Sequence, residues 1–387
     1  MTPQRLVYVL KTFPKLSETF IAGELAELRR RGIELRILSM LPPREELRHD
    51  IIRSAGLEQL TVYEPEKFAS LVCEFRPQLL HAHFATESTA TARELAVRAD
   101  IPFTFTAHGY DIHRKPPPDF RERAMAARAV VTVSEANADY IARTFGVPRE
   151  HMRVIPCGVD TEVFYPLKSS QPTPSPSQEG SAGAPAMVSS PPGRGQGWVQ
   201  SQKPLLVCVA RQVKVKNLGL LLAACAELQR RAVEFRCAMI GDGPLREELK
   251  AKRAELGLES IVEMPGAAEQ GEVLRWWQSA AVAVLTSDNE GMPVSLMEAA
   301  ACGVPAAATR VGGVSELVRD GETGLLAPAG DARGLADALE RLLRDAALRA
   351  RFGAAARRRA EEKFSIARQV GQLLALWSEI LDGGGRA

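Results

Sequence analysis

Two glutamates, Glu290 and Glu298, stand eight positions apart in the stretch DNEGMPVSLMEA, which follows a short apolar run. Pro293 suits the first turn of a helix, because the N–H that proline lacks would have no partner there. A helix that starts at Pro293 leaves free amides around Gly291 and Met292, and with the helix dipole these amides favour an anion. Glu290 would lie before the helix and Glu298 inside it, so the two carboxylates would flank the anion and accept hydrogen bonds from hydroxyl groups. A nucleotide sugar, with a diphosphate between two hydroxyl-bearing groups, fits this arrangement.

Two cations, Arg211 and Lys216, follow the apolar run PLLVCVA in the stretch ARQVKVKN. Fixed cations at the end of a strand can neutralise the charge that grows on a diphosphate leaving group in the transition state. We assign Lys214, between them, to a solvated loop. The later turn Gly241–Gly243 we interpret as structural.

Histidines end two other apolar runs. His108 follows FTFTA and precedes a flexible glycine, so it can donate a hydrogen bond to a sugar hydroxyl or to a leaving phosphate. His81 and His83 stand two positions apart in HAHF. We assign them to opposite faces of one strand, which would exclude a shared metal ion, and we expect structural roles for both.

These residues need a framework that brings several strand ends together. Short apolar runs alternate with helical runs along the chain, and continuous apolar strands separated by helices imply parallel sheets covered on both faces. The sequence therefore predicts an α/β fold of two Rossmann-like, doubly wound domains, with ligands at the carboxyl ends of strands in the cleft between the domains. The predicted strands are 5–10, 33–40, 77–83, 102–109 and 129–134, then 204–210, 235–243, 260–266, 282–287 and 305–310.

The composition is that of a soluble globular protein large enough for two domains, with 387 residues, 45% hydrophobic and 25% charged. A formal net charge of +2 argues against nucleic acid as a partner, because nucleic-acid binding needs a concentrated basic excess. Six scattered cysteines without a C-x-x-C pair indicate buried, reduced thiols in a cytoplasmic protein. No leader peptide and no apolar run of membrane-spanning length is evident. We therefore expect a cytoplasmic protein whose membrane contact, if it has one, is peripheral and at the inner face of the cytoplasmic membrane.

Residues 168–203 are rich in Pro, Ser, Gly and Gln and nearly devoid of aliphatic side chains. Such a segment cannot bury enough apolar area to offset the entropy of ordering it, so it predicts a disordered linker. A Pro-rich docking site is the weaker interpretation, since the segment lacks a basic P-x-x-P core. The expected domains are 1–167 and 204–363, followed by a last helix in 364–387.

The pattern from Glu290 to Glu298, followed by Ala-x-Ala-Cys-Gly-x-Pro, resembles the E-x7-E signature of the retaining glycosyltransferases of family 4, which have the GT-B fold. The resemblance covers nearly the whole chain outside the linker. Further segments similar to the family, in matching order and spacing, are 133–166, 210–228, 241–258 and 311–328. The series is far more specific than any one segment.

This resemblance implies a retaining hexosyltransferase that binds a UDP- or GDP-sugar in its second domain and an acceptor in its first. It implies neither a metal ion nor another cofactor. In this family Glu298 should hold the ribose hydroxyls of the donor, and Glu290 should contact a hydroxyl of the transferred sugar. His108 stands in the family's T-x-H-G-x-D context, and Arg211 and Lys216 correspond to its diphosphate-binding cations. Gly291, Met292 and Pro293 would complete the donor site, and the last helix would pack back on the first domain.

The chain departs from the family pattern at several positions. Ala210 and Asn217 replace glycines of the loop that carries the cations. Glu316 suits a helix cap as well as a ligand contact, and both roles stay open. The stretch LKTFPKLSETFI replaces a Gly-Gly loop, with Ser17 as the expected N-cap of a helix over 19–32. This stretch resembles a subgroup of exopolysaccharide and colanic-acid-type synthesis, which implies a saccharide or lipid-linked saccharide acceptor.

The implied mechanism is a direct substitution on one face of the sugar, in which the departing diphosphate helps to deprotonate the acceptor. No carboxylate pair with the spacing of a glycosidase is evident. Asp288-Asn289-Glu290 imitates a D-x-D metal motif, but its place ahead of a helix favours a metal-free site. The alternatives are a nucleotide-sugar epimerase or a sugar phosphorylase on the same fold, and a protein that only binds sugar nucleotides. The donor sugar, its base, the acceptor and the oligomeric state are not readable from the chain.

Overall fold

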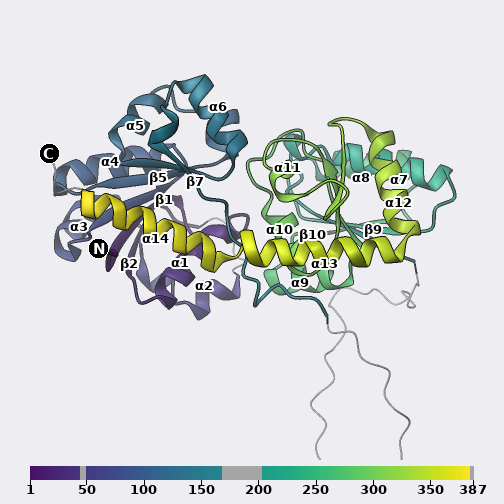
Figure 1. The fold of residues 1–387 in the computed structure, drawn as a ribbon, viewed down its shortest axis with the longest axis horizontal. Coiled ribbons are helices and arrows are strands. Elements are labelled where there is room, and N and C mark those ends of the chain that lie inside the picture. Colours follow the sequence, from purple (N-terminus) through teal and green to yellow (C-terminus); the bar gives the residue numbers. More distant parts are fainter. Residues whose placement is uncertain (44–48, 168–202, 384–387) are drawn as a thin grey trace, which may run out of the picture.

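The computed structural model describes residues 1–43, 49–167 and 203–383, which form two parallel β-sheets flanked by helices (Figure 1). Within these ranges the strand order is β3-β2-β1-β4-β5-β6-β7 in one sheet and β10-β9-β8-β11-β12-β13 in the other. The order reverses between β1 and β4 and between β8 and β11, so each sheet is doubly wound and has a switch point where ligands bind. The predicted fold of two Rossmann-like domains is confirmed.

All ten predicted strands are present, and three more complete the sheets. The first sheet contains β1 (Arg5–Thr12), β2 (Glu34–Leu41), β3 (Thr61–Val62), β4 (Leu79–His83), β5 (Phe103–Ala107), β6 (Ala129–Thr132) and β7 (Met152–Val154). The second contains β8 (Leu205–Val209), β9 (Arg236–Ile240), β10 (Val262–Gly266), β11 (Val282–Leu285), β12 (Ala306–Thr309) and β13 (Gly324–Ala327). The unpredicted β3, β7 and β13 are outermost strands of two to four residues, too short for a recognisable apolar run.

Helices alternate with the strands, as crossover connections between parallel strands require. The first lobe contains α1 (Thr19–Arg30), α2 (Asp50–Ser54), α3 (Phe68–Phe75), α4 (Glu87–Ala99), α5 (Phe120–Ala126) and α6 (Glu135–Phe145). The second contains α7 (Leu218–Arg230), α8 (Arg246–Glu255), α9 (Gln270–Ser279), α10 (Val294–Ala301), α11 (Val314–Leu317), α12 (Ala332–Arg344) and α13 (Ala346–Lys363). The last helix is α14 (Ile366–Gly383).

The central strand β1 is buried on both faces. Leu6 and Tyr8 belong to one hydrophobic cluster, while Val7 and Val9 belong to another. Since successive side chains of a strand point to opposite faces, the two clusters cover the two faces of the sheet. The continuous apolar run of β1 is therefore explained by helices on both sides.

Helix α14 returns to the first lobe and lies beside α1 (Figure 1). Val159 and Ser365 form a short parallel bridge where the chain passes between the lobes. A Cβ on Gly158 would lie 2.5 Å from the Cα of Ile366, so glycine permits this close passage. Leu373 and Trp377 of α14 are buried in the same cluster as Tyr8.

Helix α1 begins at Thr19 with Glu18 at its N-cap, so the expected cap at Ser17 is wrong. Glu18 pairs with Lys15 and makes no side-chain cap bond, while Ser17 lines the cleft described below. The local sequence suited a serine cap, but the loop places Ser17 in the wall of the cleft instead.

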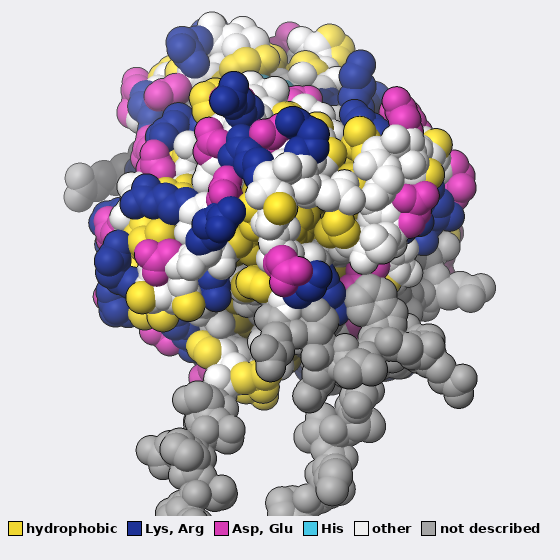
Figure 2. Space-filling model, turned by 90° about the vertical axis from the view of Figure 1, so that its right-hand side faces the viewer, with side chains coloured by type: hydrophobic (Ala, Val, Ile, Leu, Met, Phe, Trp, Pro, Cys, Tyr) yellow, Lys and Arg dark blue, Asp and Glu magenta, His cyan; other side chains and the backbone are white. Residues whose placement is uncertain are grey.

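Basic and acidic side chains alternate on the face seen in Figure 2, in keeping with the small net charge. The six cysteines, all in the described ranges, are free; five are buried, whereas Cys73 is exposed. Among the described helices, none combines the length and apolar character needed to cross a bilayer. Residues 168–202 of the expected linker lie outside the described ranges.

Candidate active site

A cavity of about 790 Å³ lies between the lobes, and both lobes line it. Its walls include the segments that follow β1, β4, β8 and β11, which are the strands at the two switch points, and the segment that follows β5. Of the eight candidate residues named from the sequence, six line this cavity: His108, Arg211, Lys216, Glu290, Gly291 and Met292. Pro293 and Glu298 are buried beside it but are not among its lining residues.

An ion pair marks the second-lobe wall. Lys216 Nζ contacts Glu290 Oε1, and Ser287 Oγ donates a hydrogen bond to the same oxygen at 2.5 Å. The side chains of Lys216 and Glu290 are 19% and 11% exposed, so both are held in place yet reachable from the cavity. Arg211 lines the cavity with an exposed side chain.

The loop that carries Arg211 and Lys216 has Ala210 and Asn217 at the positions of the two family glycines, and its backbone accommodates both residues. Asn217 has φ 43°, a left-handed conformation that asparagine tolerates better than most residues, and its Nδ2 donates to Asp288 Oδ1 at 2.8 Å. Ala210 keeps a negative φ, and the close contact is made by Gly241, whose Cβ would lie 2.0 Å from the carbonyl oxygen of Ala210. The glycine turn therefore supports the loop, as its structural interpretation suggested.

Helix α10 starts one residue later than expected, at Val294, and Pro293 is its N-cap. Gly291 precedes it where the two lobes come close together, since a Cβ on Gly291 would lie 3.1 Å from the backbone nitrogen of Gly109. The first amides of a helix have no partners within it, and Val294 lines the cavity. This end of α10 therefore provides a positive wall for an anion.

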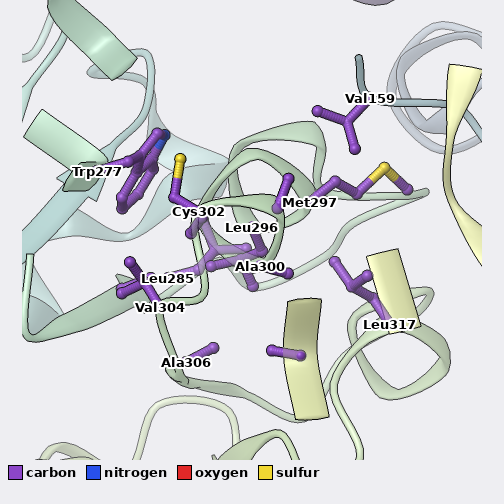
Figure 3. Close-up of a cluster of buried hydrophobic side chains, with 14 of the residues drawn as sticks. Val159, Trp277, Leu285, Leu296, Met297, Ala300, Cys302, Val304, Ala306 and Leu317 are labelled. Atoms are coloured by element: carbon purple, nitrogen blue, oxygen red, sulfur yellow. The ribbon is translucent and has the colours of Figure 1, made fainter. Parts of the chain in front are cut away.

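Glu298 is 6% exposed and contacts Trp277. Figure 3 shows the hydrophobic cluster to which Trp277, Met297 and Cys302 belong. Trp277 Nε1 donates to Glu298 Oε2 at 3.4 Å, a weak hydrogen bond. Burial raises the pKa of Glu298 to about 7, although the indole bond lowers it. In the described part of the chain Glu298 Oε1 has no hydrogen-bond partner, and this oxygen is not fully enclosed by protein atoms. One carboxylate oxygen is thus left for another partner.

His108 opens on the cavity from the first lobe and packs against two phenylalanines, Phe20 and Phe84, with ring centroids 5.0 and 4.6 Å away. Its backbone amide donates to Asp111 Oδ1 at 2.8 Å, and Ala85 N donates to Oδ2 at 2.7 Å. Burial raises the pKa of Asp111 to about 7, against the lowering effect of these amides. Asp111 thus fixes the loop that carries His108.

The assignment of His81 and His83 to opposite faces was wrong. Side chains two positions apart in a strand share a face, and the two rings lie 5.1 Å apart in the core. His83 Nδ1 lies 3.0 Å from His108 Nε2, so His83 is connected to the cleft. Sequence reasoning also missed Glu24, a buried carboxylate that contacts His83.

Glu316 caps a helix, but not its own helix α11, whose N-cap is Gly313 without a side-chain hydrogen bond. Its carboxylate accepts hydrogen bonds from the backbone amides of Glu135 at 3.0 Å and Ala136 at 2.9 Å. These are the first amides of α6, so a residue of the second lobe caps a helix of the first. The contact holds the lobes together beside the cleft.

Two Rossmann-like domains that face one cleft are the GT-B arrangement, and in this chain cations, a carboxylate and a histidine line the cleft. Residues 17–163 match the family model Glycosyltransferase Family 4, and residues 194–359 match Glycosyl transferases group 1. Together these ranges cover more than half of the chain. The chain therefore belongs to the GT-B glycosyltransferases of the family 4 type.

The chain is also similar to individual glycosyltransferases. The chain is 31% identical over 280 residues to the colanic acid biosynthesis glycosyltransferase WcaL of Escherichia coli (strain K12), covering 68% of this chain but only 61% of that protein. A mannosyltransferase of Mycolicibacterium smegmatis, named as GDP-mannose-dependent and acting on phosphatidylinositol monomannoside, is 31% identical over 60% of this chain and 50% of its own length. The structure of Anabaena HepE with UDP-glucose superposes with a TM-score of 0.74 at 16% identity, over 96% and 99% of the two chains.

Proposed function

We propose that the protein transfers a sugar from a UDP- or GDP-sugar to a saccharide or lipid-linked saccharide, with retention of the anomeric configuration. The observation that carries this proposal is that His108, Arg211, Lys216 and Glu290 line one cavity between the domains. Its volume of about 790 Å³ suits a ligand of nucleotide-sugar size.

The donor would lie along the second lobe. Arg211, Lys216 and the first amides of α10 suit the diphosphate, because they concentrate positive charge at one place. Glu290 suits a hydroxyl of the transferred sugar, since it is an acceptor held by Lys216 and Ser287. In this arrangement Lys216 would contact the diphosphate and Glu290 the sugar, so the ion pair would span the bond that breaks.

Glu298 suits the ribose hydroxyls. Its carboxylate is buried with one weak hydrogen bond, and a buried carboxylate is stabilised when further donors reach it. Two ribose hydroxyls would supply such donors next to the cavity. The position of Glu298 behind the lining residues means that the ribose would have to enter more deeply than the sugar.

The mechanism that we propose is a same-face substitution without a metal ion. Arg211 and Lys216 stabilise the leaving diphosphate as its negative charge grows, which is the task that a metal ion performs in other transferases. The leaving oxygen takes the proton of the acceptor hydroxyl. Glu290 is already bonded to Lys216 and Ser287, which suits it to position the sugar better than to attack it.

The acceptor would enter along the first lobe. This wall contains Lys11, Lys15, Arg114 and Lys115. Lys11 and Lys15 also pair with Glu87 and Glu18. A basic wall suits an acceptor that carries phosphate, as a lipid-linked saccharide does. The similarity to a protein named for colanic acid biosynthesis supports a role in exopolysaccharide or envelope polysaccharide synthesis, and we place that role in the cytoplasm at the inner face of the membrane.

The nucleotide of the donor is UDP in our first choice and GDP in the second. HepE was solved with UDP-glucose, and the mycobacterial relative is named for GDP-mannose, so the comparisons support both.

The test is a product assay with purified protein, UDP- or GDP-sugars and lipid-linked saccharide acceptors, with the anomeric configuration of the product read by NMR. We expect an α-linked product from an α-linked donor. An epimerase would change the donor without an acceptor, a phosphorylase would require inorganic phosphate, and a binding protein would form no product. Any of these three results would contradict the proposal.

A further inference from the structure

A buried carboxylate, Glu24 of α1, lies at one end of a hydrogen-bonded chain whose other end is His108. Tyr8 Oη donates to Glu24 Oε1 at 2.5 Å, and Gln369 Nε2 of α14 donates to Oε2 at 2.6 Å. His83 Nε2 lies 3.2 Å from Glu24 Oε1, and His83 Nδ1 lies 3.0 Å from His108 Nε2. Glu24 and His83 are at most 1% exposed, while His108 lines the cavity.

The carboxylate of Glu24 determines which ring nitrogens of His83 and His108 carry a proton. Tyr8 and Gln369 donate to the two oxygens of Glu24, so both oxygens act as acceptors. His83 must then donate to Glu24 from Nε2, which leaves a lone pair at its Nδ1 when the ring is neutral. His108 therefore donates to His83 from Nε2 and keeps its own lone pair at Nδ1.

The ring of His108 suits this neutral form. Burial, and to a lesser degree the neighbouring His83, lowers the pKa of His108 well below its usual range. Within the described residues Nδ1 of His108 has no hydrogen-bond partner. This nitrogen is also not fully enclosed by protein atoms. Since the ring lines the cavity, Nδ1 is open to a ligand there.

We propose that Glu24 and His83 are positioning residues that fix the tautomer of His108, so that its Nδ1 accepts a hydrogen bond from a sugar hydroxyl in the cleft. This inference rests on the proposed function, and it reverses the role expected from the sequence, in which His108 donates. It also gives α14 a part in the site, because Gln369 holds the far oxygen of Glu24.

A metal site is the other use for these residues. Glu24, His81 and His83 offer ligand atoms within 4.8 Å of one another. However, both ring nitrogens of His81 are bonded already, to the hydroxyls of Thr104 at 2.8 Å and Thr106 at 3.0 Å. The contacts therefore favour a chain of hydrogen bonds over a metal ion.

The test is nitrogen NMR of histidine-labelled full-length protein, with His108 assigned from the spectrum of His108→Gln. In the wild type we expect the proton of neutral His108 on Nε2. In Glu24→Gln the new amide can donate to His83 Nε2, so the chain can reverse and place a proton on Nδ1 of His108. We expect this change of tautomer together with about a tenfold lower kcat/KM for sugar transfer, since one hydrogen bond to the substrate is lost.

Glu27→Gln is the matched control, because Glu27 is on the same helix but bonds Arg30 and Arg31. It should keep the tautomer and the rate of the wild type. A proton on Nδ1 of His108 in the wild type would overturn the inference even if Glu24→Gln does not fold, and so would normal transfer by a folded Glu24→Gln. Failure of the wild type to transfer sugar from any donor would instead overturn the proposed function, whatever the tautomer.

Discussion

Lys216 and Glu290 form an ion pair on the second-lobe wall of the cleft. The cation that we assign to the leaving diphosphate is therefore held by the carboxylate that we assign to the transferred sugar. Fixed charges that need no reorientation during the reaction are the main source of transition-state stabilisation in many enzymes. The ion pair therefore connects the residue that would stabilise the leaving group with the residue that would bind the transferred sugar.

Replacing Lys216 tests the leaving-group role. Lys216→Met should lower kcat/KM by about 10²–10³-fold, because it removes a charge that stabilises the departing diphosphate. Initial rates with saturating acceptor measure the effect. Lys214→Met is the control, since Lys214 is exposed and does not line the cavity. A similar loss in both variants would contradict a specific role for Lys216.

The buried Glu298 should make stability depend on pH. Its carboxyl ionises near pH 4.5 when unfolded and at about 7 when folded. Because the folded pKa is raised, this group's contribution to stability is present below pH 4.5 and is lost as pH rises to about 7. The loss is on the order of 3 kcal/mol at most.

Glu298→Gln removes this ionisation. The stability of the variant relative to wild type, measured by denaturant unfolding, should therefore rise between pH 5 and pH 8. Asp111 shifts in the same direction but is present in both proteins, so its contribution cancels in the difference. A difference that stays constant over this pH range would contradict the raised pKa of Glu298.

The cap that Glu316 places on α6 should hold the domains together. Glu316→Ala should weaken the first turn of α6 by about 0.5–2 kcal/mol, the usual contribution of a cap. Hydrogen exchange at the amides of Glu135 and Ala136 should become faster. Glu322→Ala is the control, because Glu322 pairs with Arg319, its neighbour on the same turn, and not with the other lobe in the described ranges. Unchanged exchange in Glu316→Ala would show that the contact is not maintained in solution.

Helix α14 should stabilise the first domain although it follows the second in sequence. Trp377 is fully buried among residues of the first sheet, so Trp377→Ala should cost about 3–5 kcal/mol. Exchange should increase in β1 and α1. Glu379→Ala, an exposed change on the same helix, should have little effect. If Trp377→Ala increased exchange only in the second domain, this account of α14 would be wrong.

The sequence predicted the sheets well because their strands are buried on both faces and read as continuous apolar runs. It predicted the cleft-lining residues because ligand sites of doubly wound sheets lie at the carboxyl ends of strands. Glu24 could also have been found from the sequence, by the pattern of its helix. It shares a helix face with Ile21 and Leu28, and a charge on such a face is a signal of a buried partner.

Other parts of the site had no such signal. Glu316 meets its partners about 180 positions away, and only the way in which the domains face each other brings them together. The contact of His83 with His108 depends on two neighbouring strands and their register. It was missed because the two histidines of HAHF were placed on the wrong faces.

The measurement that tests the account most directly is a calorimetric titration of the wild type, Glu290→Ala and Glu298→Ala with UDP and GDP, then with the matching sugar donors. If Glu298 holds the ribose, Glu298→Ala should weaken binding of the free nucleotide and of the donor alike, by roughly ten- to a hundredfold. If Glu290 contacts the transferred sugar, Glu290→Ala should leave nucleotide binding nearly intact and lower turnover. Equal damage to nucleotide binding from both changes would contradict this division of roles, and a wild type that binds no nucleotide would contradict the proposed function itself.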